Sequence, residues 1–263
     1  MKKLILNNTF QNSLLILFGF IFLGRAFYNL LIHGSDFQTI YELSVYFSNQ
    51  NDVYNWVEKN PSYPQFSYLL VYPFTIFEFT TAKIIFFFIN LFLLLGSIVI
   101  LIKNYFLNKY QAKILILIAL TATPTTNLLA IGNLSIITLF FLLIYFFSNS
   151  IFIKAIGLLI AFMKYNVSFL FVIFSLLEKE YKTLLFFSLF YVLGVFFYYL
   201  YLGSFEIQRV FDPFYFALGL INADIIPDSG IDLGFYSVQN ILISLGHKNL
   251  YPYIFLILIS LIC

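Results

Sequence analysis

Long apolar runs separated by short polar breaks make up most of the chain. The first run, residues 13–32, follows Lys2 and Lys3 and has no small-residue cleavage site after it, which indicates an uncleaved membrane anchor. Further apolar runs cover residues 68–79, 84–102, 114–131, 134–147, 151–163, 167–177 and 183–202, followed by the weaker 238–245 and by 251–263. This pattern predicts an all-α, polytopic membrane protein with short, broken helices.

The breaks between runs indicate where a site lies. Polar interruptions at membrane depth are tolerated only where they are buried in protein or line a cavity. The breaks at 132–133 and 164–166 therefore point to a site between helices. We expect one transmembrane domain over residues 1–263, made of a first span (13–32), an outer loop (33–63), a helical bundle (64–202), a second outer loop (203–235) and C-terminal helices (236–263). The last run stops after about two-thirds of a span, so we expect a truncated sequence.

Charge is unevenly distributed and sets the expected orientation. Nine of the twelve acidic residues fall in segments 33–63 and 203–235, where Lys59 and Arg209 are the only Lys or Arg residues. Eight of the other eleven lysines gather near residues 2–3, 103–113, 154 and 179–182, which the positive-inside rule places in the cytoplasm. We therefore expect a cytoplasmic N-terminus and an extracytoplasmic site in the cell's inner or plasma membrane.

One segment does not fit this alternation. Two apolar runs lie between Tyr63, expected outside, and Lys103, expected inside, where only one crossing is allowed. Either residues 64–79 form a re-entrant or half-inserted helix, or the charge rule fails locally. Pro64 and Pro73 favour the first alternative, because proline interrupts helices.

Composition narrows the function classes. The chain is 62% hydrophobic and 10% charged, with mean hydropathy +0.94, which excludes a soluble globular protein and a disordered tail. A net charge of +2 offers no basic face, so nucleic acid is not an expected partner. The single cysteine, Cys263, excludes a disulfide framework, and His33 and His247 lack ligand spacing. We expect no cofactor; a divalent cation stays open but has no support in the sequence.

Asp36 and Lys164 are the main candidate site residues. Asp36 follows the first span at the membrane boundary, where it is placed either to act as a general base or to start a short helix over 37–49. Lys164 interrupts an apolar run, where an ionisable group suggests either pairing with a phosphate or snorkelling to the interface.

Other polar positions have both structural and functional interpretations. Asn133 follows Gly132 at a tight turn that requires a positive φ, and its amide can also bind a donor head group. Tyr63 either stacks on a sugar or belongs to the aromatic belt, and Pro64 is placed to begin a helix. Arg25, within the first span, is expected to pair with another helix. Arg209 lies in the long acidic loop.

The order of these motifs resembles a known group of enzymes. The motifs are Asp36-Phe-Gln-Thr-Ile-Tyr41, then Tyr63-Pro64-Gln65 with Pro73, then Pro124 before Gly132-Asn133, and finally Gly157 before Met163-Lys164. Over roughly residues 13–200 the chain resembles the GT-C membrane glycosyltransferases, specifically glycosyltransferase family 87. It departs from the family pattern at Gln65, where a second proline is usual, at Asn133, where glutamine is usual, and after Lys164, where no proline follows closely.

The resemblance implies a GT-C-like bundle and a hexosyltransferase, with mannose the expected sugar. A polyprenyl-phosphate sugar would be the donor and a lipid or glycan the acceptor, with inversion at the anomeric carbon. It implies Asp36 as the catalytic base and Lys164 as a partner of the lipid phosphate. We expect Arg209 and Asn133 to assist in binding the donor, and Tyr41, Tyr63 and Gln65 to line the substrate site.

Two other functions stay open at this point. A transporter or flippase of lipid-linked or small substrates would show inverted repeats with matching broken helices, and the chain has no convincing repeat. A non-catalytic assembly subunit is compatible with the short chain. Only the enzyme requires Asp36 and Lys164 to lie at the same membrane face.

Overall fold

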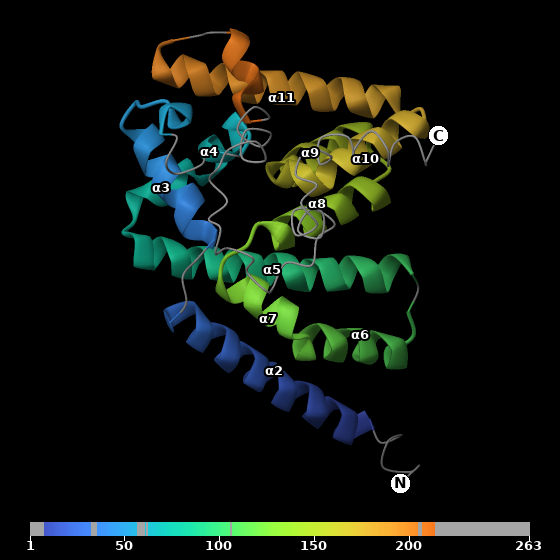
Figure 1. Cartoon of the computed structure of the whole chain (residues 1–263). Coiled ribbons are helices and arrows are strands. Elements are labelled where there is room, and N and C mark those ends of the chain that lie inside the picture. Colours follow the sequence, from blue (N-terminus) through green and yellow to red (C-terminus); the bar gives the residue numbers. More distant parts are fainter. Residues whose placement is uncertain are drawn as a thin grey trace, which may run out of the picture. The chain divides into compact units, whose positions relative to one another are not determined.

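The computed structural model describes residues 8–32, 36–56, 61, 63–105, 107–204 and 207–213. Within these ranges the chain forms ten α-helices and four short 3-10 helices, and no strand (Figure 1). The α-helices are α2 (Asn8–Ile32), α3 (Asp36–Ser48), α4 (Gln65–Val71), α5 (Phe79–Asn104), α6 (Lys109–Thr121), α7 (Thr123–Ala130), α8 (Ser135–Phe147), α9 (Ile151–Ala161), α10 (Tyr165–Leu177) and α11 (Tyr181–Leu202). The 3-10 helices are η1 (Val53–Asn55), η3 (Tyr72–Ile76), η4 (Phe162–Lys164) and η5 (Ile207–Phe211). The all-α prediction is confirmed.

The chain packs as two compact units. The first comprises Met1–Asn55 and Tyr63–Phe205, and the second Trp56–Ser62 and Glu206–Cys263. All helices except η5 belong to the first unit. The predicted apolar runs at 238–245 and 251–263, and the acidic loop beyond residue 213, lie outside the described residues.

Helix lengths separate spanning from non-spanning elements. Three described helices are long and apolar enough to cross a membrane, namely α2, α5 and α11. The predicted run 114–131 is not one straight helix, because α6 and α7 meet at a 59° bend and together make at most one broken span. Ala122 adopts an extended backbone there, and Pro124 lies in the first turn of α7, where its missing N–H costs no hydrogen bond.

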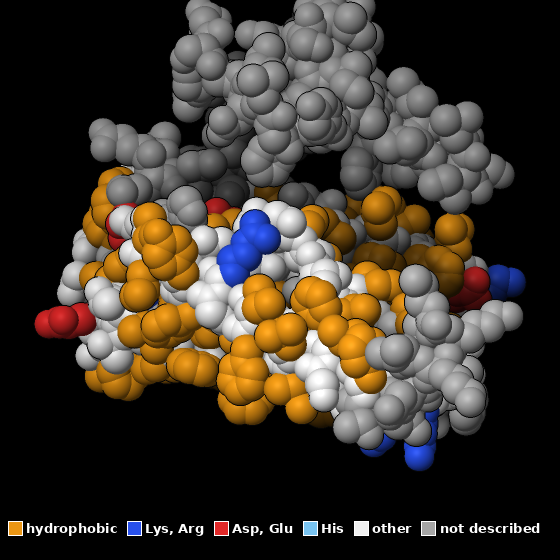
Figure 2. Space-filling model, turned by 90° about the horizontal axis from the view of Figure 1, so that it is seen from below, with side chains coloured by type: hydrophobic (Ala, Val, Ile, Leu, Met, Phe, Trp, Pro, Cys, Tyr) orange, Lys and Arg blue, Asp and Glu red, His pale blue; other side chains and the backbone are white. Residues whose placement is uncertain are grey.

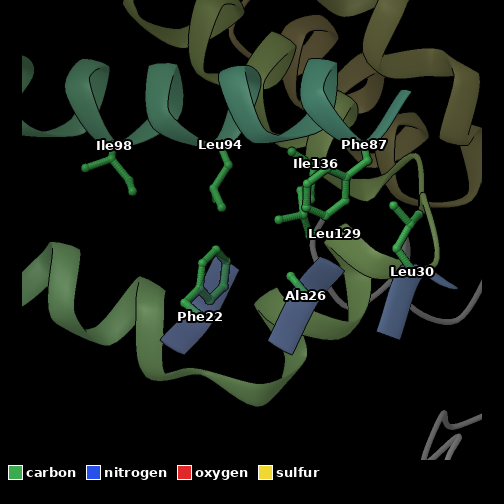
Figure 3. Close-up of a cluster of buried hydrophobic side chains, with 8 residues drawn as sticks. All are labelled: Phe22, Ala26, Leu30, Phe87, Leu94, Ile98, Leu129 and Ile136. Atoms are coloured by element: carbon green, nitrogen blue, oxygen red, sulfur yellow. The ribbon is translucent and has the colours of Figure 1, made fainter. Parts of the chain in front are cut away.

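A cluster of buried hydrophobic side chains packs between α2 and its neighbours. Phe22, Ala26 and Leu30 repeat every four residues and so share one helix face, which Figure 3 shows pointing towards α5. The facing side chains are Phe87, Leu94 and Ile98 from α5, Leu129 from α7 and Ile136 from α8. This cluster fixes the start of α8, where the polar break at 132–133 lies.

The outer face of α2 is apolar, with one cation. Phe20 is 73% exposed, and Ile16, Ile21 and Leu31 are also exposed, as expected for a helix that faces lipid. Figure 2 shows a broad hydrophobic surface interrupted by a basic side chain. Arg25 is exposed on α2 rather than inserted between helices, so the structure does not show the predicted pairing with another described helix.

The segment between Tyr63 and α5 begins and finishes at the same end of the helical bundle. It holds only the seven-residue α4 and the five-residue η3. Its end is tied to α3 by the Tyr41 hydroxyl, which donates to the Phe77 carbonyl at 2.7 Å. The Lys83 ammonium, on the second turn of α5, donates to the Leu30 carbonyl at the end of α2. Residues 64–79 therefore hold no helix long enough to span a membrane, and the re-entrant or half-inserted placement of this segment stays a prediction.

The lysine-rich turns lie together at the other end of the bundle from the start of α5. The Lys113 ammonium donates to the Gln11 side chain at 3.1 Å, which joins the beginnings of α6 and α2. The Tyr105 and Phe147 rings lie 5.7 Å apart, which joins the ends of α5 and α8. The grouping that the positive-inside rule requires is present, while the assignment of this end to the cytoplasm stays a prediction.

Close helix packing at Gly157 gives a first test of the fold. A Cβ at Gly157 would lie 2.8 Å from the Phe141 carbonyl oxygen, so α8 and α9 touch backbone to backbone there. We expect Gly157→Ala to destabilise the protein by about 1–3 kcal/mol, because rigid backbone must move. Gly24→Ala is the matched control: nothing lies within 4 Å of its added Cβ, and alanine favours helix. Thermal unfolding in detergent measures both, and equal midpoints would contradict this packing.

Candidate active site

The turn between α7 and α8 forms the centre of the site. Gly132 has φ +67° and follows the end of α7, where the Asn133 N–H donates to the Leu128 carbonyl at 3.0 Å. This is a Schellman-type ending, in which glycine is favoured because it adopts a positive φ without strain. The tight turn predicted from Gly132 is confirmed, and it directs the next residue, Asn133, away from α7.

The Asn133 side chain joins the two principal candidates. Its amide nitrogen donates to a carboxylate oxygen of Asp36 at 2.5 Å. Its amide oxygen accepts from the Lys164 ammonium at 3.0 Å. Three segments that are far apart in sequence are therefore connected through one amide, with Asp36 and Lys164 at the same end of the bundle.

Asp36 is held at this point by the start of α3. It is the first residue of that helix, so the predicted helix over 37–49 is present one residue earlier, at Asp36–Ser48. The N–H of the following residue, Phe37, donates to the Ile131 carbonyl at 3.3 Å. Asp36 is exposed, whereas Phe37 is fully buried and anchors the helix start. Asp36 therefore starts a helix and also lies next to the other site residues.

Lys164 enters the site from the break between α9 and α10. The short η4 replaces regular helix there, and the residues before Lys164, Phe162 and Met163, are buried. Its ammonium also donates to the Ser135 hydroxyl at 2.6 Å. The Lys164 side chain is half-buried, and its ammonium donates hydrogen bonds to neutral side chains inside the protein.

Tyr63 belongs to the same neighbourhood. Burial and, to a smaller extent, the negative charge of Asp36 together raise the pKa of its phenol to about 12. The phenol therefore stays protonated and able to donate a hydrogen bond. Its backbone is fixed by the Tyr54 hydroxyl, which donates to the Tyr63 carbonyl at 2.7 Å. Pro64 follows as the N-cap of α4, so the helix predicted to begin at Pro64 begins one residue later, at Gln65.

The other three candidates are not part of this group. Tyr41 is buried, and its hydroxyl is engaged by the Phe77 carbonyl, so it packs α3 against the start of α5. Gln65 is fully buried in the first turn of α4. Arg209 lies in η5 of the second unit, which is described separately from the first. The substrate-lining roles of Tyr41 and Gln65, and donor binding by Arg209, stay predictions.

Ser135 is a site residue that the sequence interpretation missed. Its N–H and hydroxyl both donate to the Asn133 amide oxygen, at 2.8 Å and 2.6 Å. Asn133 thereby caps the start of α8 while it holds Lys164. An Asn followed two residues later by Ser at the beginning of an apolar run is the signal that could have identified this pair.

Several buried hydroxyls near Tyr63 lack protein partners. The hydroxyls of Ser67, Tyr68 and Tyr191 make no hydrogen bond among the described residues. The Tyr68 phenol interacts electrostatically with Tyr63 and Tyr165, and the Tyr191 phenol interacts in the same way with Tyr165. These side chains therefore lie close together. An unsatisfied buried polar group costs about 1–3 kcal/mol, so these groups favour a polar ligand or water between α4 and α11.

No metal centre is evident in the part of the chain that the structure describes. Within it, no group of three or more His, Cys, Asp or Glu side chains is arranged to hold an ion. The acids Asp224, Asp228 and Asp232 of the second loop lie outside the described residues. The expectation of a cofactor-free protein stays a prediction.

Comparison with known proteins decides the family. The model of glycosyltransferase family 87 matches residues 62–260, which is most of the chain. The chain belongs to glycosyltransferase family 87. No curated protein and no solved structure gives a match. The family and the apolar helices together indicate a membrane glycosyltransferase, which uses a sugar donor and an acceptor.

The range of the family 87 match corrects the extent of the resemblance. The match begins at residue 62 and extends to residue 260, whereas the sequence motifs suggested residues 13–200. Tyr63, Gln65, Asn133, Lys164 and Arg209 lie inside it, and Asp36 and Tyr41 lie before it. The case for Asp36 therefore rests on its hydrogen bond with Asn133.

The bridging amide gives a test of the site's construction. Asn133→Ala leaves the Lys164 ammonium with one partner fewer and uncaps α8, so we expect a loss of about 1–3 kcal/mol in the free energy of unfolding. Asn51→Ala is the matched control, because Asn51 is exposed and bonds only weakly, at 3.3 Å, to the nearby Asn49 carbonyl. Thermal unfolding of both variants in detergent measures the difference. Equal losses would show that the Asn133 bridge contributes nothing.

Proposed function

We propose that this family 87 enzyme transfers a hexose, expected to be mannose, from a polyprenyl-phosphate donor to a hydroxyl of a lipid or glycan acceptor. The reaction proceeds with inversion, at the outer face of the cell's inner or plasma membrane. Asp36 is the general base, and Lys164 binds the donor phosphate. Family membership supports the glycosyltransferase class, and the residue roles rest on the geometry below.

The observation that carries the proposal is the Asp36–Asn133–Lys164 chain. Two hydrogen bonds through one amide keep the carboxylate and the ammonium within about 8 Å of each other. An inverting displacement needs its base and its leaving-group partner on opposite sides of the anomeric carbon. In inverting glycoside hydrolases the two catalytic carboxyl groups are about 6.5–9.5 Å apart, which leaves room for the attacking water, and an acceptor hydroxyl needs similar room.

The proposed step uses these two groups on opposite sides of the sugar. An Asp36 carboxylate oxygen takes the proton from the acceptor hydroxyl as that oxygen forms a bond to the anomeric carbon. The bond from the anomeric carbon to the phosphate oxygen breaks, and polyprenyl phosphate leaves with one more negative charge. The Lys164 ammonium stabilises this growing charge, and its low-dielectric surroundings strengthen the interaction.

Neutral donors around the site suit a polyhydroxylated substrate. The Tyr63 phenol stays protonated next to Asp36, and the hydroxyls of Ser67, Tyr68 and Tyr191 are buried without partners among the described residues. We infer that hydroxyls of the sugar or acceptor bond to this group. Arg209 is a second residue proposed to bind the donor phosphate, and only the sequence supports this role.

The distribution of lysines supports the proposed membrane face of the site. The lysine-rich turns share one end of the bundle and the Asp36 site lies at the other, which fits a cytoplasmic N-terminus and an extracytoplasmic site. A sugar carried on a polyprenyl phosphate reaches the protein from within the bilayer. Membrane lipids are thus direct partners of the enzyme.

Asp36→Asn tests the base. The amide keeps the shape but cannot accept the acceptor's proton, so we expect transfer to fall about 10²–10⁴-fold with unchanged membrane expression. Glu42→Gln is the matched control, because Glu42 lies on the same helix and its carboxylate bonds to Gln38. The assay is transfer from polyprenyl-phosphate mannose by purified protein. Normal transfer by Asp36→Asn would remove Asp36 from the reaction, and normal transfer by Asp36→Asn/Lys164→Met would remove both residues from it. No transfer by the purified wild type would indicate a subunit without catalysis.

The pH profile tests Lys164. Loss of the Lys164 proton removes the charge that stabilises the leaving phosphate, so transfer should decline on the alkaline side as this ammonium titrates. Lys164→Arg should retain partial activity and move that decline to higher pH, because guanidinium does not titrate there. Lys164→Met should raise KM for the donor and lower kcat. An alkaline decline at the same pH in wild type and Lys164→Arg would assign the titration to another group.

A further inference from the structure

A second polar site lies at the other end of α9 and α10 from Lys164. These helices hold 11 and 13 residues, so their far ends lie about 16–20 Å from the η4 break. A cavity of about 420 Å³ opens there, where the chain enters α9 and α11. Its polar lining comes from Asn149, Lys154, Lys179, Glu180, Lys182 and Thr183.

The cavity carries excess positive charge. The Lys154 ammonium is paired with the Glu180 carboxylate at 2.5 Å, and both side chains are about three-quarters buried. This pair is neutral overall and forms the floor of the cavity. Lys179 and Lys182 are exposed at the rim and make no ion pair within the described part of the chain. The cavity lining therefore holds three ammonium groups and one carboxylate, and the exposed Glu178 next to Lys179 offsets part of this positive charge.

Lys179 occupies a position that a lysine disfavours. It follows the end of α10 with φ +59°, and the next N–H, of Glu180, donates to the Ser175 carbonyl at 2.9 Å. Glycine is the usual residue in such a left-handed helix ending. A side chain held there at a conformational cost suggests a use for that side chain.

Apolar side chains flank the charged cavity on the lipid-facing surface. Ile151 and Phe152 in the first turn of α9 are 40% and 52% exposed. Tyr181 and Leu185 at the start of α11 are 60% and 69% exposed. A charged pocket beside apolar surface matches a phospholipid, with its head group in the pocket and its acyl chains along the helices, better than a free phosphate ion.

We propose that this cavity binds the phosphate of an anionic phospholipid in the leaflet opposite the Asp36 site. Lys179 and Lys182 hold the phosphate, and the Lys154–Glu180 pair fixes the floor between α9 and α11. The neighbouring apolar side chains contact the acyl chains. This site is separate from the proposed sugar transfer and does not depend on it.

The test compares two double variants that lose the same charge. Native mass spectrometry of the full-length protein, in micelles containing phosphatidylglycerol or phosphatidylcholine, measures bound lipid. We expect wild type to retain phosphatidylglycerol in preference, and Lys179→Gly/Lys182→Gln to bind it about thirtyfold more weakly, since each lysine contributes about fivefold. Lys103→Gln/Lys109→Gln is the control, because both lysines are exposed and do not line the cavity.

Folding is controlled within the same experiment. Glycine suits the backbone at position 179, so the cavity variant should not unfold at a lower temperature, and Lys179→Arg/Lys182→Arg should restore binding. Equal losses in the two double variants would reduce the effect to general surface charge and overturn the site. Equal retention of phosphatidylcholine, or full displacement of the lipid by inorganic phosphate, would likewise overturn it.

Discussion

The Asn133 amide is the interaction on which the active end of this protein depends. It donates to Asp36 and accepts from Lys164, and it also receives the N–H and hydroxyl of Ser135. An amide can do this because it carries a donor and an acceptor on one rigid plane. A carboxylate at position 133 would repel Asp36, and an apolar side chain would leave the half-buried Lys164 ammonium with fewer partners. The three elements therefore meet in a fixed arrangement before any substrate binds.

Much of this end could be predicted because polar breaks in an apolar chain are informative. Gly132 indicated a turn with positive φ, and the structure has φ +67° there. Lys164 marked a helix break, which is η4, and the acidic loop began with a helix at Asp36. Each signal is local, because glycine, proline and charge each restrict the backbone or the burial of their own residue. The prolines of residues 64–79 likewise indicated interrupted helix, and the segment holds only the short α4 and η3.

Other features could not be predicted, because they depend on which side of a helix faces the core. Tyr41 and Gln65 stand within suggestive motifs, yet Tyr41 bonds to the Phe77 carbonyl and Gln65 is fully buried in α4. Neighbourhood in sequence does not fix direction on a helix, where adjacent residues point about 100° apart. The bend between α6 and α7 was also missed, since a continuous apolar run carries no sign of a change in direction other than Pro124.

Helix length explains why a cation can be kept at Lys164. The long helices α2, α5 and α11 hold 25, 26 and 22 residues and can each cross a hydrocarbon core of about 30 Å. The shorter α9 and α10 extend only about 16–20 Å from the lysine-rich end to Lys164, which is less than the thickness of that core. An ammonium between apolar helices is costly unless it is paired or meets an anion. The amide and hydroxyl partners satisfy it in the free protein, and a lipid phosphate entering from the membrane would satisfy it more strongly, so the short helices themselves favour a lipid-borne donor.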